Sequence, residues 1–148
     1  MKVTIPYTPR KQQAFIHTEL DKHRFSVLCC HRRFGKTVML INHLIKECMM
    51  NKNHQPRFAY IAPTYSQAKK IAWDYLKFYT KGLPGTKYNE TELRCDFFNG
   101  ARITLLSSES PGSIRGIYLD GVFCDEASQI SRELIDEVIR PALSDRKG

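Results

Sequence analysis

The sequence has 148 residues, 42% of them hydrophobic and 26% charged, as expected for one soluble globular domain with a sizeable core. No apolar run could cross a membrane, and the N-terminus lacks a signal-peptide core, so a cytoplasmic protein is expected. The formal net charge of +8 favours a polyanionic partner, although a solvated basic surface is a common alternative.

The first three predicted elements alternate helix, strand and helix. Apolar spacing predicts a helix over residues 9–22, with Thr8 as a possible N-cap and Pro9 at the first helical position. A β-prone run predicts a strand over residues 24–30. Apolar residues at helical spacing predict a second helix over residues 36–50.

The middle of the chain continues this alternation. A strand over residues 57–62 is stopped by Pro63, and a helix over residues 66–79 follows. The Asn99-Gly100 pair is a strong hairpin signal. Its two predicted strands cover residues 93–98 and 101–106.

The last predicted elements are a strand over residues 119–124 and a helix over residues 131–143 that Ser131 caps. Alternating strands and helices indicate an α/β fold with a mainly parallel sheet flanked by helices, plus a β-hairpin. We expect one domain over residues 1–148.

The five cysteines show no Cys-x-x-Cys spacing and complete no four-ligand set, so a zinc site among them is not expected. Cys29, Cys30 and Cys124 fall in predicted strands, where they resemble small core residues of a reducing compartment.

The junction between the first strand and the second helix has the pattern of a phosphate-binding loop. A basic loop leads into Gly35-Lys36-Thr37 at the start of the helix. Backbone N–H groups there would face phosphates, with the Lys36 ammonium beside them and the Thr37 hydroxyl on Mg²⁺. The usual pattern has a glycine where this chain has Cys30. The alternative is a plain surface turn with a solvated Lys36.

Two acids follow the last predicted strand. Asp125 and Glu126 come directly after the apolar run 121–124, and carboxylates at the end of a buried strand are costly unless they are used or exposed. In phosphate-loop NTPases the first acid holds Mg²⁺ and the second polarises the attacking water. The alternative is that Asp125 caps the segment that follows.

Blocks in a fixed order resemble the large terminase subunit of tailed phages, the ATPase that drives DNA into the capsid. The blocks are Tyr7–Gln13, with the pattern of an adenine-recognition segment; Cys30–Thr37, a deviant phosphate loop; Ile61–Lys69, continued by Trp73–Lys77; and Ile114–Gly116, followed by Val122–Ala127 with the acidic motif.

The resemblance implies roles for individual residues. Glu126 would be the catalytic carboxylate, Arg32 would sense or stabilise the γ-phosphate, and Thr37 and Asp125 would hold Mg²⁺. Gln13 is the expected adenine contact, although the neighbouring Gln12 is an alternative. The residues expected to bind nucleotide are Gln13, His31, Arg32, Arg33, Phe34, Gly35, Lys36 and Thr37.

The resemblance also implies a P-loop NTPase core of the RecA/ASCE-like type, with ATP and Mg²⁺ as ligands. Expected partners are double-stranded DNA, the portal and the small terminase subunit, in a homo-oligomeric ring of the full protein in the host cytoplasm, without a membrane. The family pattern continues into a coupling motif and a nuclease domain, so the chain reads as an incomplete, N-terminal ATPase domain.

Two other functions fit the sequence. One is a fragment of a related P-loop helicase or DNA translocase. The other is a basic module that binds nucleic acid without hydrolysing ATP. Arg115, in a predicted loop, could contact phosphate, DNA or a neighbouring subunit's nucleotide, or could be solvated.

Overall fold

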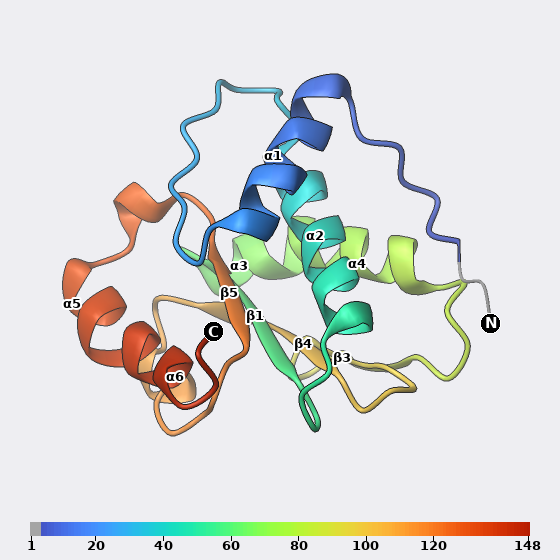
Figure 1. The fold of residues 1–148 in the computed structure, drawn as a ribbon. Helices are drawn as coiled ribbons and strands as arrows, with labels where there is room; N and C mark the ends of the chain where they lie inside the picture. The colour runs from blue at the N-terminus through green and yellow to red at the C-terminus, as the bar shows by residue number, and fades with distance from the viewer. Residues whose placement is uncertain (1–3) are drawn as a thin grey trace.

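A computed structural model describes residues 4–148, so the domain expected over residues 1–148 is described except for its first three residues. Figure 1 shows one sheet with helices on both faces. The sheet has the strand order β2-β3-β4-β1-β5. The strands are β1 (Arg57–Ala62), β2 (Lys87–Asn89), β3 (Arg94–Asp96), β4 (Arg102–Ser107) and β5 (Gly121–Cys124).

The central strand β1 pairs in parallel with both β4 and β5, whereas β3 pairs antiparallel with β2 and β4. The prediction of an α/β fold with parallel core strands and a hairpin is therefore confirmed, and β2 is a strand that the sequence pattern missed.

The long helices are α1 (Lys11–Lys22) and α2 (Lys36–Met50). Two further helical segments each contain a π-helical turn: α3 (Tyr65–Gln67), Ala68–Ala72 and α4 (Trp73–Thr80); then α5 (Arg132–Leu134), Ile135–Ile139 and α6 (Arg140–Ser144). Thr64 and Ser131 cap these segments, as their hydroxyls accept hydrogen bonds from Gln67 N and Leu134 N at 3.2 Å. Within residues 4–148 no helix is both long and apolar enough to span a membrane.

The core has two layers, one on each face of the sheet. Helices α2 and α4 cover one face, and α5 and α6 cover the other (Figure 1). Alternate residues of β1 point into the two layers: Tyr60 lies in the first, and Ala59 and Ile61 lie in the second. Burial on both faces explains why β1 reads as a continuous apolar run.

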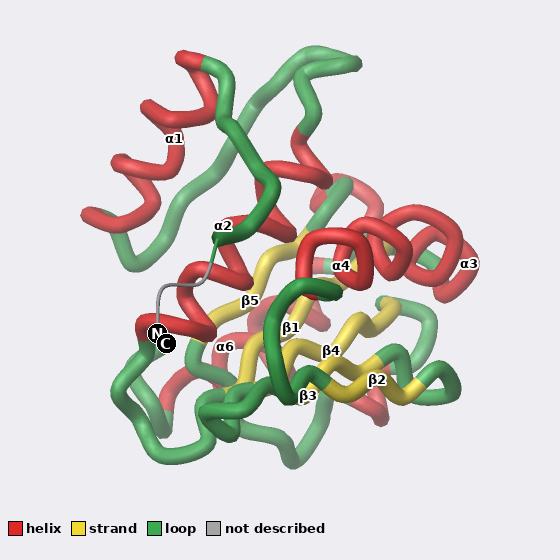
Figure 2. The backbone as a smooth tube through the Cα atoms, turned by 90° about the vertical axis from the view of Figure 1, so that its right-hand side faces the viewer, coloured by secondary structure: helices red, strands yellow, loops and turns green. Residues whose placement is uncertain are grey.

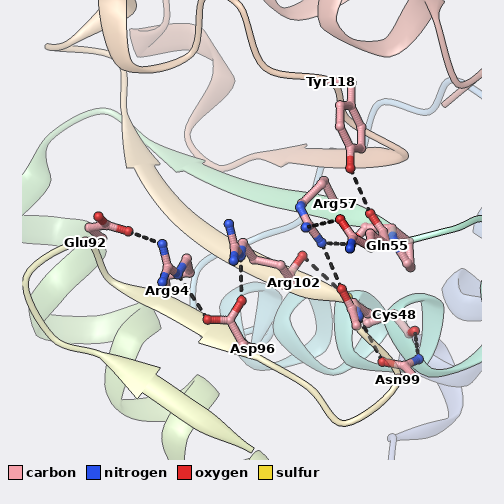
Figure 3. Close-up of polar contacts among 12 residues, drawn as sticks. Cys48, Gln55, Arg57, Glu92, Arg94, Asp96, Asn99, Arg102 and Tyr118 are labelled. Carbon is pink, nitrogen blue, oxygen red and sulfur yellow. Dashed lines mark hydrogen bonds and ion pairs between the residues drawn. The ribbon is translucent and has the colours of Figure 1, made fainter.

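The turn between β3 and β4 is tied to two neighbouring elements (Figure 3). Gly100 supplies the positive φ of 81° that the turn needs, and its carbonyl accepts a hydrogen bond from Arg57 Nη1 at 2.8 Å. The side-chain amide of Asn99 donates to the carbonyl of Cys48, at the end of α2, at 2.9 Å. These bonds help fix the register of β4 on β1.

One predicted strand is absent. Residues 24–30 form no strand, and Val27 is 89% exposed. Within residues 4–148 β5 pairs only with β1, and no strand joins its other edge to residues 24–30. A β-prone run becomes a strand only where it finds a backbone partner, so composition alone gave the wrong answer here.

Two smaller expectations are also wrong. The first helix begins at Lys11 with Arg10 as N-cap, rather than at Pro9 after Thr8. The side-chain oxygen of Gln13 accepts a hydrogen bond from Arg10 N at 3.0 Å, and this bond fixes the start of the helix. Cys29 was expected in the core, but it is exposed because the strand that would bury it does not form. The buried cysteines are Cys48 and Cys95.

Candidate functional site

The phosphate-loop motif and the acidic motif meet at the carboxyl ends of β1 and β5. Lys36 is the first residue of α2, and Asp125 directly follows β5. The Thr37 hydroxyl donates to Asp125 Oδ2 at 3.4 Å, across 88 positions of sequence. The fold therefore brings together the two motifs that the sequence placed far apart.

Asp125 is held by three donors. Besides Thr37, the hydroxyl of Tyr60 donates to its Oδ2, and the backbone N–H of Glu126 donates to its Oδ1 at 2.9 Å. Tyr60 is 1% exposed, and burial, followed by the charge of Asp125, raises the pKa of its hydroxyl far above the ordinary value. Tyr60 thus stays protonated and acts as a permanent donor.

Sequence reasoning missed Tyr60. The available signal was a tyrosine inside the apolar run 57–62, since a buried tyrosine hydroxyl needs a hydrogen-bond partner. The sequence could not show that Tyr60 lies on the strand next to the one that precedes Asp125.

The loop before α2 has unusual backbone geometry. Gly35 has φ 83° and ψ 34°, and Arg33 adopts φ 63°, which is uncommon outside glycine. The Lys36 ammonium donates to the Cys30 carbonyl at 3.4 Å, so it reaches back across the loop. These features place a left-handed turn and the Lys36 ammonium directly beside the N-terminus of α2.

Gln13 supports the loop from α1. Its side-chain amide donates to the carbonyls of Phe34 at 3.1 Å and Gly35 at 3.5 Å, and the residue is 4% exposed. A Cβ on Gly35 would lie 2.9 Å from Gln13 Nε2. The side chain predicted to contact adenine is therefore engaged with the loop itself, whereas Gln12 is exposed; adenine contact stays a prediction for both.

The remaining predicted loop residues divide by exposure. Phe34 is 8% exposed and belongs to the core, so only its backbone is available to a ligand. His31, Arg32 and Arg33 are exposed around it. The His31 Nδ1 atom lies 2.5 Å from the carbonyl oxygen of Arg32.

Glu126 is exposed and has φ 50°, in the left-handed region. It starts the short 3₁₀ turn Ala127–Gln129, and Gln129 N donates to its carbonyl at 2.8 Å. Within residues 4–148 no hydrogen bond engages its carboxylate. Asp125 does not cap this turn, because the N-cap position belongs to Glu126, and this argues against the capping alternative.

Arg115, the further candidate from the sequence, lies away from the phosphate loop. Arg115 lines a pocket of about 590 Å³ between residues 115–118 and the helix that ends in α6. A second pocket, of about 280 Å³, lies between residues 116–119, the amino end of β1 and alternate residues of β4. Neither includes a predicted nucleotide-binding residue.

Comparisons with known proteins agree with this geometry. Residues 31–147 match the family described as terminase large subunit, T4likevirus-type, N-terminal. The chain is similar to the solved large terminase ATPase domain of Thermus phage P74-26 (25% identity, TM-score 0.79), with 97% of this chain and 63% of that one covered.

An arginine-to-alanine mutant of the same domain matches with 24% identity and a TM-score of 0.79, covering 97% of this chain and 64% of that chain. The chain thus spans just under two thirds of the solved domains. No curated protein sequence matches it significantly.

Proposed function

The chain belongs to the T4-like terminase large subunit family, within its N-terminal part, and on this premise we propose that it binds and hydrolyses ATP in a viral DNA-packaging motor. The observation that carries the proposal is the contact between Thr37 and Asp125 at the N-terminus of α2. It joins a phosphate-loop motif to an acidic motif at the carboxyl edge of parallel strands, where α/β folds place ligands.

Phosphate binding would use backbone and side chain together. The first N–H groups of α2 have no partner within the helix and carry the positive end of its dipole. The Lys36 ammonium, now on the Cys30 carbonyl, is near enough to the loop to exchange that bond for a phosphate oxygen. Arg33 and Gly35 hold the backbone turn that presents these groups.

The residues present fit Mg²⁺. Thr37 and Asp125 offer a hydroxyl and a carboxylate oxygen that already lie 3.4 Å apart, and Mg²⁺ prefers oxygen ligands. When bound, Mg²⁺ supplies charge neutralisation at the phosphates. Tyr60, as the buried donor to Asp125, keeps that carboxylate oriented.

Two exposed residues are suited to the chemistry. Glu126, directly after Asp125, has a carboxylate that can orient an attacking water and accept its proton. Arg32 carries a permanent charge that can stabilise negative charge on the transferred phosphoryl group. Neither side chain is buried, so neither is committed to the core.

The wider context belongs to the same proposal. A packaging motor acts on double-stranded DNA in the host cytoplasm, as a ring that meets the portal and the small terminase subunit. The surplus of 23 basic over 15 acidic residues suits a polyanionic track. The family match favours this function over a helicase fragment or a basic module without ATP binding.

Calorimetric titration with Mg²⁺-ATP tests the site. Wild type should bind, and Lys36→Ala should lose at least tenfold in affinity, because it removes the charge at the helix N-terminus. Lys52→Ala is the matched control, since Lys52 is exposed in the loop after α2 and lies outside the site. Equal binding by wild type and Lys36→Ala would show that this loop is not the nucleotide site.

A further inference from the structure

We propose that the chain holds a second metal site, for a divalent transition-metal ion such as Zn²⁺, between α1 and α2. The ligands are Asp21, His43 and Glu47, called here the interhelical cluster. One ligand atom from each lies within 4.8 Å of the others. His43 Nε2 is 3.7 Å from Asp21 Oδ1 and 3.9 Å from Glu47 Oε1.

The donor set suits a transition metal. An imidazole nitrogen with two carboxylate oxygens suits Zn²⁺, Mn²⁺ or Fe²⁺, whereas Mg²⁺ and Ca²⁺ prefer oxygen alone. His43 and Glu47 are four residues apart and share one face of α2. Asp21 comes from the last turn of α1, so an ion at the cluster would join the two helices.

The burial of His43 is independent evidence for a ligand at the cluster. His43 is 4% exposed, and its Nε2 has no hydrogen bond within residues 4–148, although it is directed at two carboxylates. The neutral form of such a ring offers the lone pair that a metal requires.

The other ring nitrogens are already arranged as metal-binding histidines require. His43 Nδ1 lies 2.8 Å from His17 Nδ1, and His17 Nε2 lies 2.9 Å from the Tyr7 hydroxyl. With a metal on His43 Nε2, its Nδ1–H donates to His17, and the Nε2–H of His17 donates to Tyr7. Both imidazole N–H groups in that chain then find an acceptor, as in the outer shells of metal sites.

Lys46 competes for the cluster. Its ammonium lies 2.6 Å from Asp21 Oδ1 and neutralises one of the two carboxylates. Its side chain is 36% exposed, so it can turn to solvent when a metal takes its place. Removing Lys46 should therefore tighten metal binding, which is the reverse of what a simple ion-pair network predicts.

Titration with Co²⁺, followed by absorption and calorimetry, tests the site without ATP or Mg²⁺. Chelator-treated wild type should bind one Co²⁺. Asp21→Asn and Glu47→Gln should each weaken binding about tenfold or more, and Lys46→Ala should strengthen it. Glu19→Gln is the control on α1, since Glu19 pairs with Lys22 outside the cluster. Circular dichroism checks that each variant is folded.

Three results would overturn the proposal. They are the absence of Co²⁺ binding in wild type, unchanged binding in folded Asp21→Asn and Glu47→Gln, and weaker binding in Lys46→Ala. Unchanged binding would place the ion elsewhere, and thiolate charge-transfer bands would then identify a cysteine as a ligand.

Discussion

The candidate nucleotide site has two halves, an acidic half and a phosphate-loop half, and different parts of the fold hold them in place. The acidic half, with Asp125 and Tyr60, stands on β1 and β5, where buried backbone ladders and side-chain layers fix its position. The phosphate-loop half follows residues 24–30, which form no strand, and it is held from α1 by Gln13. The sheet thus fixes one half of the site, whereas the other half is held by Gln13 of α1 and by the core side chain of Phe34.

This difference has a physical origin. The backbone of β1 is paired with a strand on each side, and its side chains are buried on both faces. Residues 24–30 have neither, so the loop that follows depends on the Gln13 amide and on the left-handed Gly35. Four predictions, given from the largest expected effect to the smallest, test the contribution of the sheet against that of the contacts with α1.

Truncating an apolar side chain to alanine should change the free energy of unfolding far more in β1 than in residues 24–30. Ile61→Ala should lower the free energy of unfolding by about 2–5 kcal/mol, because Ile61 is fully buried in β1. Val27→Ala should change it by less than about 0.5 kcal/mol, because Val27 is 89% exposed. Urea unfolding measures both. A cost for Val27→Ala close to that of Ile61→Ala would mean that residues 24–30 form a buried strand in solution.

Tyr60→Phe should weaken the acidic half without unfolding it. The ring still fills the core, but Asp125 loses a buried donor, so the Mg²⁺ requirement for ATP binding should rise about tenfold. Tyr118→Phe is the control, since its hydroxyl bonds the Gln55 carbonyl at 3.1 Å instead. Titrating Mg²⁺ at fixed ATP gives the comparison, and an unchanged Mg²⁺ midpoint would remove Tyr60 from the site.

Gln13→Ala should loosen the loop half. It leaves the Phe34 carbonyl without its side-chain donor, at a cost of about 1 kcal/mol, or about fivefold in ATP affinity. Gln12→Ala tests the alternative adenine contact, because Gln12 is exposed and, within residues 4–148, bonds nothing in the loop: a loss confined to ATP in that variant would assign adenine contact to Gln12. Comparing ATP with GTP separates two roles: equal losses mean that Gln13 supports the loop, whereas a loss confined to ATP means that it reads adenine.

Mild acid should weaken the attachment of α1 to α2. The pKa of His43 is lowered to about 4 and that of His17 is also lowered, mainly by burial, so the unfolded chain binds more protons below about pH 6.5. The contribution of the two neutral histidines to the free energy of unfolding is therefore complete above about pH 6.5 and declines as the pH falls toward 4.

The size of this pH effect should be on the order of 1 kcal/mol or less, since burial raises the pKa of Glu47 and opposes it, and Tyr7, Asp21 and Lys46 also face the pair. Urea unfolding between pH 4.5 and 7, in a chelator, should show a flatter profile for His43→Gln than for wild type. Exposed His54→Gln should leave the profile as it is, and a profile that His43→Gln does not flatten would assign the slope to other groups.

Local patterns succeeded where an element carries its own signals. Helix α2 begins at Lys36 and ends at Met50, as predicted, because apolar spacing and Gly35 mark it. Strand β1 occupies 57–62, since an apolar run with Pro63 after it fits a doubly buried strand. The Asn99-Gly100 turn was predicted correctly for the same kind of local reason.

Prediction failed where the outcome depended on a distant partner. Residues 24–30 have strand composition but no ladder to join. Tyr60 and Asp125 are 65 positions apart, and no spacing rule relates them. The contact of the Gln13 amide with the Phe34 carbonyl likewise joins distant residues and could not be predicted, whereas adenine contact by Gln13 stays a prediction.

The sequence by itself determined the α/β alternation, the phosphate-loop and acidic motifs, and the family, because these depend on residue type and short spacing. Only the tertiary structure decided that Thr37 meets Asp125, that Tyr60 orients it, and that Gln13 and the His17–His43 pair tie α1 to α2. Each of these contacts joins elements far apart in the chain, and burial, rather than local propensity, selects them.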